Sequence, residues 1–333
     1  MRFLKRLLIV LVVLSIVYFL GPHPSKPVYS GQLPELPSSS IALENYVRQQ
    51  EAQHKIKPDN EARIVWANDS LKQKTAYAIV YLHGFSACQE EGNPVHRNIA
   101  KEFGCNLYLS RLSQHGIDTS DALYNMTAEN LWESAKQAYA IGKQLGEKVI
   151  LMGTSTGGTL ALQLAAAYPE IAGLILYSPN IAINDPNAWL LNDPWGLQIA
   201  RLVKKSKFNT AGHDEPVYRQ YWNYQYRLEA TVQLEELLET TMNKETFEKV
   251  KQPVLTLCYY KDEQHQDPVV KVSAIRTMMA DLGTAEGQKK LVPIPDAGTH
   301  VLASPIQSKD IVSVQHQTED FLKEVMHLPL ISQ

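Results

Sequence analysis

The sequence predicts an α/β fold: a mostly parallel central sheet with helices on both faces and an inserted helical cap. Three observations predict it. Short β-branched runs alternate with amphipathic stretches, one glycine-rich turn joins a strand directly to a helix, and a single long block interrupts the alternation. With 333 residues, 44% of them hydrophobic and 20% charged, the chain can bury a large core, which excludes a disordered protein.

Short apolar runs are the predicted strands, and amphipathic helical stretches separate them. The helix over residues 127–145 shows the pattern, because its apolar side chains recur at helical spacing and Gly146 is placed to end it. Further helices are expected over residues 41–53 and 311–326. The strands are predicted at residues 63–67, 77–82, 106–109, 148–152, 174–177, 254–260 and 289–294.

The N-terminus has the pattern of a targeting segment. Arg2, Lys5 and Arg6 precede an apolar run over residues 7–20. The run is shorter than the roughly 20 residues that span a bilayer, which is typical of a signal peptide. Because no small-x-small cleavage site precedes Pro22, the sequence favours an uncleaved transmembrane signal anchor over residues 1–21, with a removed signal peptide as the alternative.

Such an anchor predicts that the rest of the chain is exported. It would face the extracytoplasmic side, periplasmic or at the cell surface, and stay attached to the membrane through the N-terminal segment. Residues 22–40 are rich in proline and serine and are expected to form an extended linker.

One long block, residues 181–251, breaks the alternation and is predicted to be the helical cap. It would divide the catalytic domain into residues 41–180 and 252–333. Its rings are interpreted chiefly as the core of the cap itself, with some of them lining an apolar substrate pocket. The aromatic residues of the block include Trp189, Trp195, Tyr218, Tyr221, Trp222, Tyr224 and Tyr226.

Composition also limits the partners. The formal net charge is −3 with Lys and Arg scattered, so no surface for nucleic acid is indicated and a small-molecule substrate is expected. The cysteines lack metal-ligand spacing, so neither a metal nor a cofactor is expected. Cys105 and Cys258 are interpreted as buried thiols, and a Cys88–Cys105 disulfide is the less favoured alternative. Nothing in the sequence indicates an oligomeric state.

The strongest local motif surrounds Ser155. An apolar strand runs into Gly153-Thr154-Ser155-Thr156-Gly157 and then into a helix rich in alanine and leucine. This is the pattern of a nucleophile elbow, in which a tight turn between strand and helix holds the serine hydroxyl above the sheet. Bulky side chains at the two glycines would collide with the neighbouring strand and helix, and the sharp turn forces the serine into a strained backbone conformation.

A nucleophilic serine needs a base and an orienting acid, and in this arrangement both follow it along the chain. His300 lies in a glycine-containing loop after the last predicted strand and is the candidate base. The candidate acids follow the strand at residues 254–260. Asp267 is preferred because Asp267-Pro268-Val269-Val270 precedes the next helix, and Asp262 is the alternative acid.

The oxyanion hole is expected to combine two backbone N–H groups, one of them after the nucleophile, at Thr156. The second is expected at Phe85, because Gly84 lets the loop after an early strand turn toward the site. His83 precedes the serine and is therefore interpreted as a structural hydrogen-bonding residue of that loop.

With these residues assembled, the chain resembles the α/β-hydrolase superfamily, and within it the carboxylesterases and monoacylglycerol lipases. The resemblance covers residues 76–321. It departs from relatives in two places: Ser113-Gln114-His115-Gly116 stands where many have Pro-Gly-His-Gly, and the acid lies further beyond its strand. It rests on residues 83–85, 111–116, 153–157, 267–270 and His300.

The resemblance and the ordered Ser155, Asp267 and His300 lead to one main hypothesis, hydrolysis of carboxylic esters with an acyl or lipid-like part through an acyl-enzyme. An aminopeptidase or an acyltransferase using the same triad is the alternative, and a non-catalytic binding protein is a third hypothesis. An aminopeptidase would need carboxylates that bind a substrate ammonium. The cap offers Glu215, Glu229, Glu235 and Glu236.

Overall fold

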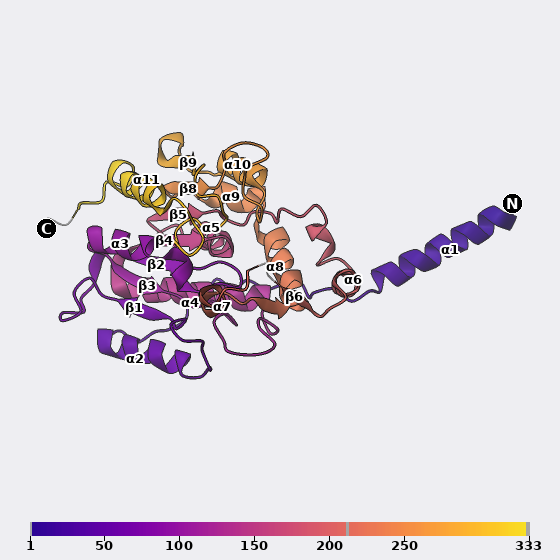
Figure 1. Cartoon of the computed structure of the whole chain (residues 1–333), viewed down its shortest axis with the longest axis horizontal. Helices are drawn as coiled ribbons and strands as arrows, with labels where there is room; N and C mark the ends of the chain where they lie inside the picture. The colour runs from indigo at the N-terminus through magenta and orange to yellow at the C-terminus, as the bar shows by residue number, and fades with distance from the viewer. Residues whose placement is uncertain (1, 211–212, 331–333) are drawn as a thin grey trace.

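The computed structural model describes residues 2–210 and 213–330, and one sheet of seven strands forms its core. The strand order is β1-β3-β2-β4-β5-β8-β9 (Figure 1). β1 pairs antiparallel with β3, and the other neighbouring pairs of this sheet are parallel. The predicted fold class is therefore confirmed. The strands are β1 (Arg63–Val65), β2 (Thr75–Leu82), β3 (Asn106–Leu109), β4 (Gly146–Thr154), β5 (Gly173–Tyr177), β8 (Val254–Cys258) and β9 (Lys289–Pro293).

Alternate residues of the central strands enter two cores, one on each face of the sheet. In β2, Ala78, Val80 and Leu82 belong to the first core, and Ile79 and Tyr81 belong to the second. Helices α4, α5 and α10 contribute to the first core, and α3 and α11 to the second, so both faces are covered (Figure 1). These helices are α3 (Val95–Glu102), α4 (Ala128–Leu145), α5 (Thr156–Ala167), α10 (Val272–Asp281) and α11 (Ile311–Glu324).

The segment between β5 and β8 carries several short helices and a two-stranded antiparallel sheet of β6 and β7. This is the block predicted as a helical cap. Its helix α9 packs on α5 and α10 of the main body. The elements are η2 (Ala188–Leu190), α6 (Gly196–Lys204), β6 (Phe208–Thr210), α7 (Pro216–Tyr221), β7 (Gln225–Arg227), α8 (Leu228–Thr241) and α9 (Lys244–Lys249). Two further 3-10 turns and a helix lie elsewhere: α2 (Ser40–Glu51), η1 (Gln89–Gly92) and η3 (Glu286–Gln288).

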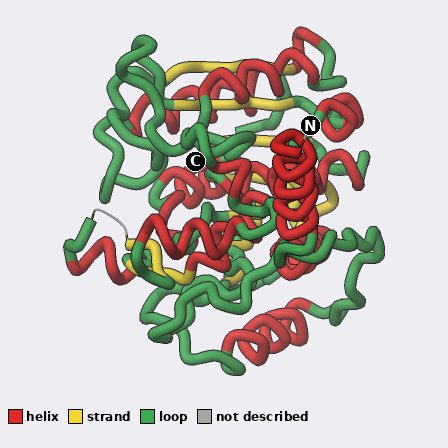
Figure 2. The backbone as a smooth tube through the Cα atoms, turned by 90° about the vertical axis from the view of Figure 1, so that its right-hand side faces the viewer, coloured by secondary structure: helices red, strands yellow, loops and turns green. Residues whose placement is uncertain are grey.

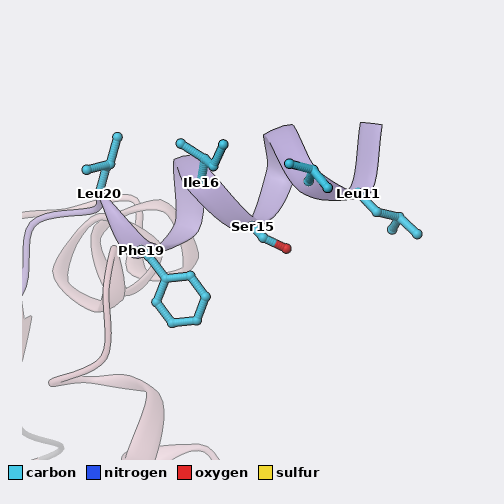
Figure 3. A pocket seen from close by; sticks show the side chains of 6 residues that line it. Leu11, Ser15, Ile16, Phe19 and Leu20 are labelled. Atoms are coloured by element: carbon cyan, nitrogen blue, oxygen red, sulfur yellow. The ribbon is translucent and has the colours of Figure 1, made fainter. Parts of the chain in front are cut away.

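The N-terminal helix α1 (Arg2–Phe19) projects from the body of the molecule beside the cap (Figure 1), and Figure 2 looks along it. It buries no residue. A shallow hollow on one side of this helix is lined by apolar side chains and Ser15 (Figure 3), and none of its lining residues can titrate.

The prediction of a transmembrane signal anchor is wrong. Among the residues that the structure describes, no helix combines the length and the apolar character needed to cross a membrane. Arg2, Lys5 and Arg6 lie within the first turns of α1. Its uncharged part is therefore shorter than the roughly 20 residues that a bilayer requires. The predicted attachment of the chain to the outer side of a membrane loses its basis for the same reason.

The predicted linker is extended, and hydrogen bonds hold it against the rest of the molecule. Between α1 and α2 the described chain has no helix or strand, yet its backbone carbonyls accept hydrogen bonds from the main body. Trp132 Nε1 donates to Ser30 O at 2.8 Å, and Tyr168 Oη donates to Gly31 O at 2.9 Å. At its start, the backbone N–H of Trp195 in the cap donates to Pro22 O at 3.0 Å. The segment is therefore a strap that joins the cap to α4 and α5.

All three cysteines are free and buried, which leaves the Cys88–Cys105 disulfide unformed. Burial raises the pKa of the Cys105 thiol to about 12 and that of Cys258 to about 11. Both are inert core thiols at neutral pH.

Candidate active site

Ser155 occupies a sharp turn between β4 and α5. Its φ of 52° and ψ of −118° lie where residues other than glycine are strained. The turn is held because the Ser155 N–H donates to Tyr177 O at 2.9 Å, which links it to the neighbouring strand β5. A Cβ on Gly157 would collide with the backbone of Leu82, and one on Gly153 would lie 2.5 Å from Gly157 O. This is the backbone geometry of a nucleophile elbow.

His300 and Asp267 form a buried pair in the loops after β9 and β8. His300 Nδ1 lies 2.7 Å from Asp267 Oδ2, and the Asp267 side chain is fully buried. The other carboxylate oxygen accepts the N–H groups of Val269 at 2.8 Å and Val270 at 3.1 Å. With Nδ1–H donated to the carboxylate, the neutral ring keeps Nε2 as an acceptor.

A small excursion of the chain explains why Asp267 stands far beyond β8 in sequence. A single β-bridge joins Tyr260 to Gln266, and the Asp267 N–H donates to Tyr259 O at 2.9 Å. The residues between Tyr260 and Gln266 therefore form a loop that is closed at its base, and Asp267 lies next to the end of β8. Asp262 stays in the loop, half exposed, and pairs with His265 at 2.8 Å.

The electrostatics of the pair favour its ionised form. Burial by itself raises the pKa of Asp267, but the charge and hydrogen bond of His300 and two backbone N–H groups outweigh it and lower that pKa overall. Burial likewise lowers the pKa of His300, yet the charge and hydrogen bond of Asp267, aided by Glu91, raise it overall. An imidazolium formed at this position is therefore stabilised.

Of the two residues predicted to supply the oxyanion amides, Thr156 follows the serine directly and Phe85 lines the same cavity. Thr156 is the first residue of α5, where backbone N–H groups have no acceptor inside the helix. Within the described residues, neither the Thr156 N–H nor the Phe85 N–H has a protein acceptor. His83 fixes the loop that carries Phe85, because its Nδ1 lies 2.9 Å from Gly84 O and its Nε2 accepts the Leu112 N–H at 3.0 Å.

A cavity of about 690 Å³ lies between the sheet and the cap. The structure brings Ser155, His300 and Phe85 together at its wall, and Asp267 reaches it through His300. Asp262 does not line it. Most of the cap side is apolar: Ile183, Leu190, Leu191, Ile199, Ala200, Val203, Leu228 and Leu234.

Three of the cap's aromatic residues reach this cavity: Tyr218, Trp222 and Tyr226. Tyr218 stacks on Trp222 with ring centroids 5.1 Å apart. Tyr226 meets the edge of Phe85 at 5.0 Å. These rings connect the cap to the predicted oxyanion loop, and the Asn223 N–H strengthens the connection by donating to Ser86 O at 2.7 Å.

The four cap glutamates considered for an ammonium site do not line the cavity. Glu229 pairs with Arg201 and Arg227, and Glu236 accepts a hydrogen bond from Asn192 at 3.0 Å. Among the described residues, two other carboxylates line the cavity, Asp185 of the cap and Glu91 beside the Gly84 loop, and no motif in the sequence singled out either of them.

Comparisons with known proteins identify the family of this chain. Residues 124–295 match the family described as serine aminopeptidase, S33, and because this is more than half of the chain, the chain belongs to that family. A thermostable monoacylglycerol lipase of Bacillus sp. (strain H-257) is 31% identical over 97 residues. That match covers 29% of this chain and 38% of the lipase, so it spans less than half of the relative.

Solved structures share the fold at low identity. A structure from work on LipS and LipT, two metagenome-derived lipolytic enzymes, has a TM-score of 0.61 at 16% identity, covering 81% of this chain and 99% of its own. The monoacylglycerol lipase of Paleococcus ferrophilus has a TM-score of 0.57 at 16% identity over 79% and 98%. Est1E from Butyrivibrio proteoclasticus, with ferulic acid bound, has a TM-score of 0.55 at 18% identity, covering 80% of this chain and 95% of its own. These likenesses support the fold of this chain.

Proposed function

We propose that this chain hydrolyses carboxylic esters with an acyl or lipid-like part, through Ser155 as nucleophile. One observation carries the proposal: the strained serine shares a cavity wall with His300, whose Nδ1 is held by buried Asp267 at 2.7 Å. A base that is oriented by a third group beside a serine hydroxyl is the arrangement that activates the serine.

The proposed reaction has two halves. His300 Nε2 takes the proton of the Ser155 hydroxyl as its oxygen attacks the ester carbonyl, and Asp267 stabilises the imidazolium that forms. The N–H groups of Phe85 and Thr156 stabilise the oxyanion. The imidazolium then protonates the leaving alcohol, and an acyl-enzyme remains. Water, deprotonated by His300, attacks the acyl carbonyl and releases the carboxylic acid.

The cavity supports the choice of substrate class. Its volume of about 690 Å³ lies within the range of small-molecule sites. Most of the cap residues that line it are apolar, with polar side chains such as Asp185 and Lys204 among them. An acyl chain could pack against the apolar residues of the cap while its carbonyl group lies at Ser155.

Hydrolysis by the Ser155→Ala variant tests the proposal. Wild-type protein should hydrolyse p-nitrophenyl esters of short and medium acyl chains, and the variant should lose at least about a thousandfold in kcat/KM. Ser313→Ala, on α11 and outside the cavity wall, is the matched control and should behave as wild type. Equal hydrolysis by wild type and Ser155→Ala would refute the proposal.

The same assay separates the alternatives. An aminopeptidase would cleave aminoacyl amides and leave simple esters intact, whereas an acyltransferase would form transfer products when an acceptor alcohol is added. A non-catalytic binding protein would not react with a fluorophosphonate probe, which labels activated serines. We expect labelling of Ser155 and preference for esters over aminoacyl amides, because most cap residues that line the cavity are apolar. Preference for aminoacyl amides would instead point to Asp185, the cap carboxylate among the described lining residues, as the site for a substrate ammonium.

A further inference from the structure

Glu91 is a buried carboxylate at the reacting end of the cavity. It lies in the short turn η1, and only 2% of its surface is exposed. It nevertheless lines the cavity together with Ser155 and His300. Burying a carboxylate costs free energy unless partners compensate for the lost water, so its contacts indicate what it does there.

The first contact is with the predicted oxyanion loop. The Gly84 N–H donates to Glu91 Oε2 at 2.6 Å. A Cβ on Gly84 would lie 2.9 Å from Glu91 Oε1 and 3.1 Å from Ser155 Cβ. The carboxylate and the nucleophile therefore flank the same glycine, and the carboxylate fixes the peptide that immediately precedes the Phe85 N–H.

The second contact is electrostatic. Glu91 and His300 both line the cavity, and the charge on each favours the charged form of the other. Trp222 of the cap also stabilises the charged carboxylate. The titratable groups that face Glu91 come from β2, from its own turn, from the cap and from the loop after β9: Tyr81, Cys88, Tyr218 and His300. Of these, only His300 becomes cationic.

We propose that Glu91 is a positioning residue: its carboxylate holds the Gly84–Phe85 loop beside Ser155, and its charge acts with that of Asp267 to stabilise the imidazolium on His300. This inference rests on the proposed function. A purely structural role would need only the hydrogen bond to Gly84, which a neutral acceptor supplies equally well. The charge is what distinguishes the two roles.

The titration of Glu91 adds support. Burial raises the pKa of Glu91 to about 7, against the opposing effects of the Gly84 N–H and His300. The two groups interact, and the pKa of His300 is also raised from its ordinary value, so their titrations are coupled. Removing the charge should lower the pKa of His300, so that the ring stays neutral, and able to accept the serine proton, at lower pH.

The test compares the pH dependence of wild type, Glu91→Gln and Glu90→Gln. Gln at position 91 keeps an acceptor for Gly84 and removes the charge. Glu90 is the matched control, because it loses the same charge one residue away, forms a hydrogen bond with Asn93 at 2.8 Å and lies outside the cavity wall. The readout is the rate at which a fluorophosphonate probe labels Ser155, which needs no ester turnover.

We expect the acid limb of the E91Q labelling profile to move to lower pH by about 0.5–1 unit, with E90Q unchanged. If the acid limb of the E91Q profile lies within roughly 0.2 pH unit of the wild-type limb, the role of the charge is overturned, even where the plateau rate of labelling is lower. The role of the charge would also be overturned if E91Q only weakened the binding of cationic esters, because Glu91 would then be a substrate-binding residue. If wild-type Ser155 is not labelled, the proposed function fails together with this inference.

A second measurement on wild-type protein guards against a variant that does not fold. In protein labelled with ¹³C at the glutamate carboxyl and ¹⁵N at the histidine ring, Glu91 and His300 should each titrate in two coupled steps. Independent single-step titrations of the two groups would overturn the proposal.

Discussion

The two sides of the cavity differ in what holds them in place. On the sheet side, Ser155, His300 and Asp267 are buried. The Ser155 N–H donates to β5, backbone N–H groups of the loop after β8 hold Asp267, and Asp267 holds His300. On the cap side, the walls are aliphatic side chains of short helices, and some, such as Ile199, are 43% exposed. The difference indicates that the sheet side carries the reacting groups and that the cap side determines which substrate binds.

The largest expected effect is on the buried acid. Asp267→Asn removes the charge that stabilises the imidazolium and disturbs the orientation of the ring, so kcat should fall about 10³–10⁴-fold. Asp262→Asn is its matched control, because Asp262 pairs with exposed His265, and it should leave kcat unchanged. Steady-state kinetics on one p-nitrophenyl ester measure both. A large loss in the Asp262 variant alone would reverse the assignment of the acid.

The next effect is on the oxyanion loop. Gly84→Ala places a methyl group against Glu91 Oε1 and Ser155 Cβ, which should displace the Phe85 N–H. We expect kcat to fall roughly 10²–10³-fold with little change in KM, as for loss of one oxyanion donor. Circular dichroism should show intact folding. If Gly84→Ala changes KM and leaves kcat at the wild-type value, the loop binds substrate and does not stabilise the oxyanion.

A smaller effect concerns pH. His300 must be neutral to accept the serine proton, and its pKa is raised overall, since the interactions with Asp267 outweigh the effect of burial. Activity should therefore be lost as pH falls through that raised pKa, about tenfold per pH unit, beginning above the ordinary histidine value of about 6.5. A profile of kcat/KM against pH measures this. An acid limb that begins below pH of about 6 would contradict the raised pKa.

The smallest effect is expected on the cap. Ile199→Ala removes aliphatic surface from the cavity wall, so KM for long-chain esters should rise several-fold while short-chain esters are unaffected. Leu202→Ala on the same helix α6 is the control, because Leu202 is 77% exposed and lies outside the wall. An acyl-chain-length series compares the two variants. Equal effects of both substitutions, or an equal loss on all chain lengths, would assign selectivity to another surface.

The sequence predicts the sheet side better than the cap side, and the reason is the range of the interactions. The strand runs and the Gly153-Thr154-Ser155-Thr156-Gly157 turn are local patterns, so their positions are evident without tertiary structure. The choice between Asp262 and Asp267 could not be settled locally, because the bridge between Tyr260 and Gln266 decides which carboxylate returns to the sheet.

The positions of Glu91 and of the cap residues at the cavity depend on contacts between segments that are distant in the sequence. Glu91 belongs to no motif, and its place beside Ser155 follows only from how η1 packs on the Gly84 loop. The N-terminal anchor was predicted from the apolar residues 7–20, but charge and length at the start of α1 decide against a membrane span. The catalytic roles of Ser155, Asp267 and His300 stay predictions.

Labelling with a fluorophosphonate probe, followed by peptide mass spectrometry, tests the central claim most directly. The account predicts that the probe attaches to the Ser155 hydroxyl in wild-type protein, that Asp267→Asn slows the reaction strongly, and that Ser155→Ala abolishes it. Labelling at a different residue, or undiminished labelling of the Ser155→Ala variant, would contradict the assignment of Ser155 as the nucleophile.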